Sequence, residues 1–156
     1  MISKQEAYTM KLEKKKLIVK REYKEVYKCE DGIVKIFEKD HPKADVFNEA
    51  LNTARVEATG LDIPCVKEVS QVDGKWAILI EYKEGTTLEE MMEADPGNLE
   101  KYMEDFVDLQ LEMHSKKAAR LNKLKDKLSA QINGLKELDA TTRYELLTRL
   151  ESMPKH

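Results

Sequence analysis

The sequence contains two Asp-Gly pairs, Asp31-Gly32 and Asp73-Gly74, and each lies between runs rich in β-branched and aromatic residues. An Asp-Gly pair in that setting is the strongest short-range signal for a β-hairpin, because the tight turn needs residues that tolerate positive φ angles. Strands joined by such short loops run antiparallel. The two pairs therefore predict two hairpins of an antiparallel sheet.

The first pair joins the run Lys16–Glu30 (KLIVKREYKEVYKCE) to Ile33–Phe37. The longer run exceeds one average strand, and its charged middle, Lys20–Glu25, is suited to a turn between two strands. The second pair joins Cys65–Val72 to Lys75–Tyr82. Together these runs predict a sheet of five strands.

The segment between the two hairpins, Ala44–Thr59, has apolar residues at helical spacing. Gly60 follows it as a stop signal, with Pro64 just beyond. The first half of the chain therefore predicts three strands, one helix and two further strands, with the helix packed against the sheet. The apolar positions of this helix are Phe47, Leu51, Ala54 and Ala58.

The rest of the chain, from Glu84-Gly85 onward, predicts helices only. Thr87-Leu-Glu-Glu90 is a capping box that opens a short helix, and Asn98 is the expected cap of a helix over Leu99–Lys117. Thr142-Arg-Tyr-Glu145 is a second capping box, for a helix that ends near Met153-Pro154. We therefore predict an α+β fold with a first domain over residues 1–83 and a helical domain over 84–156.

Lys35 lies in the middle of a strand that is apolar on both faces. Ile33 and Phe37 share its face, and Val34 and Ile36 occupy the other. Such a strand is usually covered on both sides, and a buried ammonium costs several kcal/mol unless something pairs with it. Either Lys35 extends its head to water, or a carboxylate or ligand meets it.

Two glutamates of the predicted helix, Glu49 and Glu57, are candidate partners because they lie eight residues apart and so share a helix face. An ion pair would keep Lys35 charged and aimed, as a phosphate-binding lysine must be. The last strand runs into a polar connector, Glu81–Gly85. A sheet joined to helices by one short hinge leaves a cleft in which a ligand can bind.

Four stretches of the chain resemble the aminoglycoside and choline kinase-like phosphotransferases, a family with a protein-kinase-like fold. They are "GIVKIF", "FNEALNTARVEATGLDIPCV", "WAILIEYKEGTTL" and "LEMHS". They resemble that family's third-strand lysine, its glutamate helix ending in Gly-x-x-x-Pro, its hinge and the end of its first large-lobe helix. The resemblance spans about residues 16–118. It implies a kinase-like small lobe followed by an incomplete helical large lobe.

The resemblance implies ATP and Mg²⁺ as cofactors and assigns roles to individual residues. Lys35 would contact the α- and β-phosphates, with Glu49 rather than Glu57 as its partner. Ile80 would lie at the back of the adenine pocket. The main-chain carbonyl of Glu81 and the main-chain amide of Lys83 would hydrogen-bond the adenine.

The chain departs from the family in two places. The loop over the phosphates is Gly-rich in protein kinases, whereas Arg21–Val26 contains no glycine, so a side chain such as Lys24 would have to substitute. The family's catalytic loop resembles H-G-D-x-x-x-x-N, and that motif is missing. The two candidate aspartates, Asp126 and Asp139, have Gln131 and Tyr144 where the asparagine would fall.

We therefore expect this chain to be the N-terminal, nucleotide-binding portion of an ATP-dependent small-molecule phosphotransferase. Its catalytic aspartate and asparagine and its metal ligands are expected beyond His156, so the chain alone should transfer no phosphate. The phosphoryl acceptor stays open: an aminoglycoside, choline, a sugar, homoserine or a protein side chain. In the family, acceptor-binding residues come mostly from the large lobe.

Two other classes of function stay open. One is a non-catalytic, pseudokinase-like interaction module. The other is a helical adaptor that docks on a partner through an apolar stripe, for which self-association is also expected. The stripe consists of Leu121, Leu124, Leu128, Ile132 and Leu135.

Charge and composition exclude several classes of partner. The net charge of −3 gives no reason to expect nucleic acid or an acidic membrane surface. No apolar run approaches the roughly 20 residues of a membrane span, and the first residues lack the apolar core of a secretion signal. Cys29 and Cys65 suit reduced thiols of a cytoplasmic protein. The three histidines are too scattered to predict a metal site.

Overall fold

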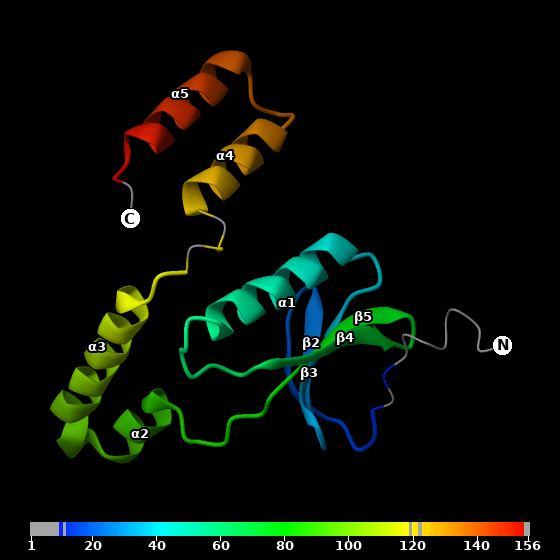
Figure 1. The fold of residues 1–156 in the computed structure, drawn as a ribbon, viewed down its shortest axis with the longest axis vertical. Helices are drawn as coiled ribbons and strands as arrows, with labels where there is room; N and C mark the ends of the chain where they lie inside the picture. The colour runs from blue at the N-terminus through cyan, green and yellow to red at the C-terminus, as the bar shows by residue number, and fades with distance from the viewer. Residues whose placement is uncertain (1–9, 11, 119, 122, 155–156) are drawn as a thin grey trace. The chain divides into compact units, whose positions relative to one another are not determined.

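The computed structural model of the chain describes residues 10, 12–118, 120–121 and 123–154. The chain divides into two compact units, Met1–Ala119 and Arg120–His156, which are described separately below. The predicted α+β class is confirmed: the described residues form a five-stranded antiparallel sheet and five α-helices (Figure 1). The predicted domain boundary after residue 83 falls inside the first unit and stays a prediction.

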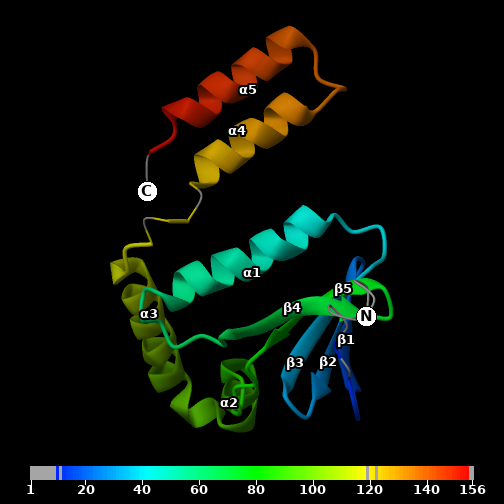
Figure 2. The same ribbon diagram turned by 45° about the vertical axis from the view of Figure 1, so that its right-hand side comes forward.

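The sheet confirms the five strands predicted from the two Asp-Gly pairs. The long run at residues 16–30 does divide in two, because β1 ends at Lys20 and β2 begins at Lys24. The strand order is β1-β2-β3-β5-β4, and every neighbouring pair is antiparallel (Figure 2). The strand bounds are β1 Lys16–Lys20, β2 Lys24–Cys29, β3 Gly32–Phe37, β4 Val66–Val72 and β5 Lys75–Ile80.

The two Asp-Gly pairs form their hairpins differently. Asp73 and Gly74 both have positive φ angles, 51° and 76°, and they form the two-residue loop that was predicted. At the first hairpin the loop lies one residue earlier, because Gly32 already pairs with Cys29 inside the sheet. Gly32 has a φ of 147°, and a Cβ added there would lie 2.2 Å from the carbonyl oxygen of Ile80. Glycine is therefore required by the close approach of β5.

The helix α1, Lys43–Glu57, covers one face of the sheet (Figure 2). Its buried residues are Val46 and Ala50, which pack with Phe37 of β3 and Ile78 of β5. The predicted apolar positions differ from these, since the Phe47 side chain is half-exposed and makes an edge-to-face contact with the Trp76 ring. The helix exists as predicted, but its buried stripe is centred one residue earlier.

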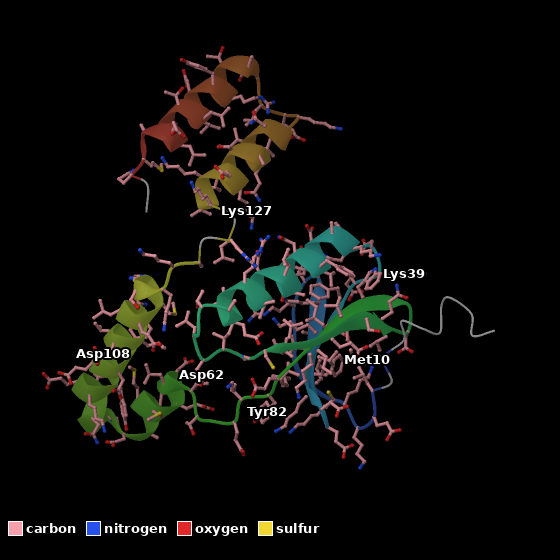
Figure 3. The ribbon with its side chains drawn as sticks, viewed as in Figure 1. Met10, Lys39, Asp62, Tyr82, Asp108 and Lys127 are labelled. Atoms are coloured by element: carbon pink, nitrogen blue, oxygen red, sulfur yellow. The ribbon has the colours of Figure 1, made fainter. Side chains whose placement is uncertain are left out.

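The opposite face of the sheet packs against Met10 and Leu12, and Met10 lies on the side away from α1 (Figure 3). Met10 is buried there against Val34 and other apolar residues of β3, β4 and β5, and its backbone N–H donates to the carbonyl of Gln71 at 2.8 Å. Both faces of β3 are therefore covered, as its two-sided apolar pattern predicts. Each fully buried aliphatic side chain contributes about 1.5–3 kcal/mol to such a core.

After β5 the first unit continues into α2, Leu88–Ala94, a short 3₁₀ turn at Pro96–Asn98, and α3, Leu99–Ser115. The capping box of α2 is confirmed: the Thr87 hydroxyl accepts from the Glu90 amide, and the Glu90 carboxylate accepts from the Thr87 amide. Asn98 is the N-cap residue of α3 as predicted, but its side chain makes no capping hydrogen bond. The Asn98 side chain instead donates to the Asp95 carboxylate at 2.6 Å, because that acid lies within reach on the preceding turn.

The second unit is a helical hairpin of α4, Leu124–Gly134, and α5, Ala140–Ser152. The predicted capping box at Thr142 is wrong, because Asp139 starts α5 three residues earlier and accepts from the amides of Thr141 and Thr142. The Arg143 guanidinium closes the end of α4 by donating to the carbonyls of Ile132, Asn133, Leu135 and Leu138. None of the helices among the described residues is long and apolar enough to span a membrane.

Candidate functional site

Lys35 lies at the centre of the sheet, where it faces Val26 of β2 on one side and Ile78 of β5 on the other. Its ammonium donates to Oε1 of Glu49 at 2.8 Å, so it neither extends into solvent nor remains unpaired. Glu49 reaches it because α1 is held against the sheet by its buried neighbours, Val46 and Ala50. The Lys35–Glu49 ion pair predicted from the sequence is therefore present.

Glu57, the alternative partner, does not reach the sheet. It lies at the last residue of α1 with an exposed side chain, and it makes no ion pair with any described residue. Lys35 and Glu49 are only 25% and 30% exposed at their side chains, so their ion pair is partly shielded from water. The structure thus resolves the choice between the two glutamates in favour of Glu49.

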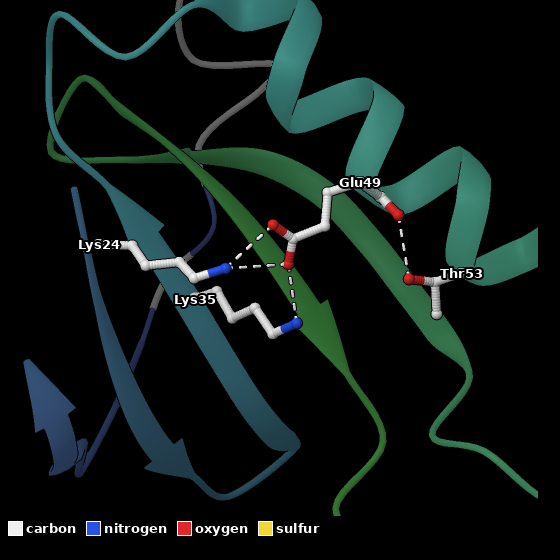
Figure 4. Close-up of polar contacts among 4 residues, drawn as sticks. All are labelled: Lys24, Lys35, Glu49 and Thr53. Carbon is white, nitrogen blue, oxygen red and sulfur yellow. Dashed lines mark hydrogen bonds and ion pairs between the residues drawn. The ribbon is translucent and has the colours of Figure 1, made fainter. Parts of the chain in front are cut away.

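A second lysine, Lys24, shares the same carboxylate (Figure 4). Its Nζ lies 3.0 Å from Oε2 and 3.2 Å from Oε1 of Glu49. Lys24 is the first residue of β2 and faces Phe37 across the sheet, so it points to the same side as Lys35. From the sequence, Lys24 was predicted only to substitute for a glycine-rich loop, and its contact with Glu49 was not predicted. Strand alternation places Lys24 and Val26 on one face, but the contact itself depends on the β2–β3 register and on the position of α1.

The three charges set the protonation state of Glu49. Burial alone raises the pKa of this carboxyl, but the hydrogen bonds from Lys35 and Lys24 outweigh burial, and its pKa lies below the ordinary glutamate value. Glu49 is therefore ionised at neutral pH and holds both ammonium groups in place. The backbone carbonyl of Glu49 accepts from the Thr53 hydroxyl at 3.0 Å, one turn further along α1 (Figure 4).

The hinge residues follow directly on β5. Ile80 is the last residue of that strand, between Ile33 of β3 and Val66 of β4. The backbone N–H of Glu81 donates to the carbonyl of Cys65 at 2.9 Å, and the Glu81 carboxylate accepts from the Cys65 amide at 3.3 Å. The connector is thereby tied to the segment that precedes β4.

Two further contacts fix the hinge side chains. The ammonium of Lys83 lies 2.6 Å from Asp62 Oδ1 and 3.5 Å from Glu81 Oε2. Lys28 of β2 places its ammonium 3.7 Å from the ring centre of Tyr82. Figure 3 labels Asp62 and Tyr82 on these segments. Within the described part of the chain, neither the carbonyl of Glu81 nor the amide of Lys83 takes part in a backbone hydrogen bond.

The donor set around Glu49 fits a polyphosphate and does not fit a metal ion. Two ammonium groups surround one carboxylate, which leaves an excess of positive charge. Both oxygens of that carboxylate already accept hydrogen bonds from lysine. Across residues 10–154, as far as they are described, no three His, Cys, Asp or Glu side chains are grouped so that they could hold a metal.

The two aspartates considered for a catalytic loop lie in or beside helices. Asp126 is in the first turn of α4 and Asp139 caps α5. His114 lies in the last turn of α3, and the His41 ring stacks on Tyr23 and Phe37 at centroid distances of 5.3 and 5.0 Å. The structure therefore gives Asp139 a helix-capping contact and His41 a ring-stacking contact.

No protein-family model matches this chain, and no curated protein is significantly similar to it. The class of protein therefore rests on the fold and on the lysine–glutamate site alone, and the resemblance to kinase-like phosphotransferases stays a prediction.

Proposed function

We propose that this chain is the nucleotide-binding portion of an ATP-dependent phosphotransferase that resembles the aminoglycoside and choline kinases. The observation that supports the proposal is the ion pair between Lys35 and Glu49, 2.8 Å long, which joins the third strand to the single helix on the sheet. An ion pair between that strand and that helix is required for phosphoryl transfer in protein kinases. The order of strands and helix around it is also the order expected of such a lobe.

Each residue at the site has a role in this proposal. Lys35 binds the α- and β-phosphates of ATP, and Glu49 keeps its ammonium charged and aimed. Ile80 closes the back of the adenine pocket. The carbonyl of Glu81 accepts a hydrogen bond from the adenine, and the amide of Lys83 donates one. Ionised acceptors on the ligand make the contacts to lysine about twice as strong as neutral hydrogen bonds.

The proposed reaction is transfer of the γ-phosphate to a hydroxyl of a small molecule, in the cytoplasm. Bound Mg²⁺ would supply charge neutralisation of the phosphates in this chemistry. The described residues hold no metal-binding group, and the sequence lacks the H-G-D-x-x-x-x-N motif. We therefore expect this 156-residue chain to bind nucleotide weakly and to transfer no phosphate.

The same missing motif favours a second candidate, a non-catalytic module of pseudokinase type. Such a module keeps the fold of the lobe and acts through its contacts with another protein. Nucleotide affinity does not separate the two candidates, because a pseudokinase-like lobe can retain it. The sequence of the gene beyond the codon for His156 does: an H-G-D-x-x-x-x-N motif there supports the phosphotransferase, and its absence supports the non-catalytic module.

Nucleotide titration tests the proposal. We expect Lys35→Ala and Glu49→Ala to weaken ATP binding, Lys35→Ala by about ten- to a hundredfold, since a charge-assisted hydrogen bond is worth roughly 1.5–3 kcal/mol. Glu57→Ala is the matched control, because it removes a glutamate from the same helix that makes no ion pair with any described residue. The proposal fails if Lys35→Ala and Glu49→Ala bind ATP as Glu57→Ala does, or if the wild-type chain binds no adenine nucleotide.

A further inference from the structure

The charges around Glu49 do not balance. Lys24 and Lys35 contribute two positive charges, and Glu49 is their only carboxylate partner among the described residues. An ammonium group has three N–H donors. Lys35 makes one contact with Glu49 and Lys24 makes two, so the pair retains donor capacity for a further acceptor. The acceptor that would balance the site is an anion.

Lys24 is the more buried of the two lysines, with a side chain 13% exposed against 25% for Lys35. Burial of an ammonium is costly unless opposite charge or polarisable groups surround it. The rings of Tyr23 and Phe37 both lie 5.3 Å from the Lys24 ammonium and offset part of the cost. Because Lys24 shares the Glu49 carboxylate with Lys35, the charge of its half-buried ammonium is only partly neutralised.

The place of Lys24 in the fold is that of the loop that covers phosphates in a kinase-like lobe. It begins β2, directly after the β1–β2 connector, and it lies diagonally from Lys35 across the β2–β3 pair. The segment Arg21–Val26 contains no glycine, so its backbone amides are screened by side chains. A long side chain that ends in three donors can reach an anion where the backbone cannot.

We propose that Lys24 is a second polyphosphate-binding lysine, which takes the part of a glycine-rich loop and contacts a nucleoside di- or triphosphate together with Lys35. Glu49 then acts as the positioning residue for both ammonium groups. On binding, Lys24 exchanges hydrogen bonds with Glu49 for hydrogen bonds with phosphate oxygens, while Lys35 keeps its own. The inference that the ligand contains a nucleoside rests on the proposed function, whereas the inference that it contains phosphates rests on the two lysines alone.

Calorimetric titration with four probes tests the proposal: ATP, ADP, adenosine and inorganic tripolyphosphate. We expect Lys24→Met to weaken ATP, ADP and tripolyphosphate by about ten- to a hundredfold and to leave adenosine affinity unchanged. Lys24→Arg, which keeps the charge and the donors, should retain most of the affinity. Lys75→Met is the matched control, since Lys75 also forms one sheet ion pair, with Glu38 at 2.9 Å, but on the opposite face. It should change no affinity by more than about twofold.

The outcomes separate this inference from the proposed function. If Lys24→Met behaves as Lys75→Met does while Lys35→Met still weakens ATP, the role of Lys24 is refuted and the proposed function stands. If Lys24→Met weakens tripolyphosphate but ATP binds no tighter than tripolyphosphate, Lys24 binds phosphate and the nucleotide function is refuted. Loss of adenosine affinity in Lys24→Met, or a wild-type chain that binds none of the probes, also overturns the inference. A thermal melt of each variant confirms folding, and Lys24→Gln replaces Lys24→Met if the latter does not fold.

Discussion

Ion pairs occur on both faces of the sheet, but their charges are arranged differently. On the face that packs against Met10, Lys20 pairs with Glu25 at 2.8 Å and Lys75 pairs with Glu38 at 2.9 Å, so each cation has its own anion. On the face under α1, two lysines share Glu49. The balanced pairs lie at the margin of an apolar cluster, whereas the shared carboxylate lies half-buried beside one.

This difference separates stability from binding on one strand. Val34 and Lys35 are neighbours on β3 and point to opposite faces of the sheet. Val34 is fully buried and can contribute only packing. Lys35 gains little stability from its partly exposed ion pair, because desolvation offsets much of the attraction. Val34 therefore contributes to the stability of the fold, whereas Lys35 contributes the surplus charge on which the proposed binding of an anion depends.

The largest expected effect distinguishes these two neighbours. Val34→Ala removes two methyl groups from a fully buried position and should lower the free energy of unfolding by roughly 2 kcal/mol, with unchanged ATP affinity. Lys35→Met keeps the side-chain volume and leaves Glu49 paired with Lys24, so it should cost less than about 1 kcal/mol and weaken ATP binding. Urea unfolding and ATP titration of both variants measure the contrast. Equal losses of stability would contradict it.

An intermediate effect is expected when both lysines of the α1 face are removed. Each single change to methionine leaves Glu49 with one cation, but the double variant Lys24→Met/Lys35→Met leaves a half-buried carboxylate without a partner. We expect the double variant to lose about 1–2 kcal/mol more than the sum of the single variants. Lys20→Met/Lys75→Met is the comparison cycle on the other face. Each of these lysines has its own glutamate, so no carboxylate loses two hydrogen-bonded cations, and the coupling should be smaller than on the α1 face. Additivity in both cycles would show that the two faces do not differ.

The smallest effect is the contribution of Glu49 to the pH dependence of stability. Its pKa is lowered in the folded chain, so its contribution is present above the unfolded pKa and is lost as the pH falls through the folded pKa. In a plot of the urea midpoint of unfolding against pH, Glu49→Gln should therefore make the fall at acidic pH less steep. Glu57→Gln, which changes an exposed glutamate of the same helix, should leave that fall unchanged. The same dependence at acidic pH in the wild type and in Glu49→Gln would show that the ion pairs of Glu49 do not stabilise the fold.

The parts of the structure that the sequence predicted depend on local patterns. Asp73-Gly74 gave the second hairpin correctly, because a two-residue loop with positive φ angles admits few other residues. The same argument placed the first loop one residue too late, since the requirement for Gly32 comes from Ile80 on another strand. Asp139, and not Thr142, caps α5, because the local sequence does not show which of two nearby capping residues starts the helix.

The candidate site was predicted in part for a similar reason. Strand and helix periodicity reduced the candidate partners of Lys35 to Glu49 and Glu57, and only the family resemblance favoured Glu49. The position of α1 on the sheet decides between them. The convergence of Lys24 on the same oxygens depends on the β2–β3 register and on how α1 is rotated on the sheet. The register is a tertiary property. The predicted buried face of α1 was wrong by one residue, because it was centred on Phe47, whereas Val46 is the buried residue.

The close approach of Gly32 to the Ile80 carbonyl has a consequence for how this chain tolerates substitution. Any side chain at position 32 must displace the last residue of β5, from which the hinge continues. A saturation library at position 32, selected first for folding and then for ligand affinity, should retain glycine alone. Gly74, where a Cβ would meet no atom within 4 Å, should still accept asparagine and aspartate. One hairpin is thus open to sequence drift, and the other is fixed by its neighbour.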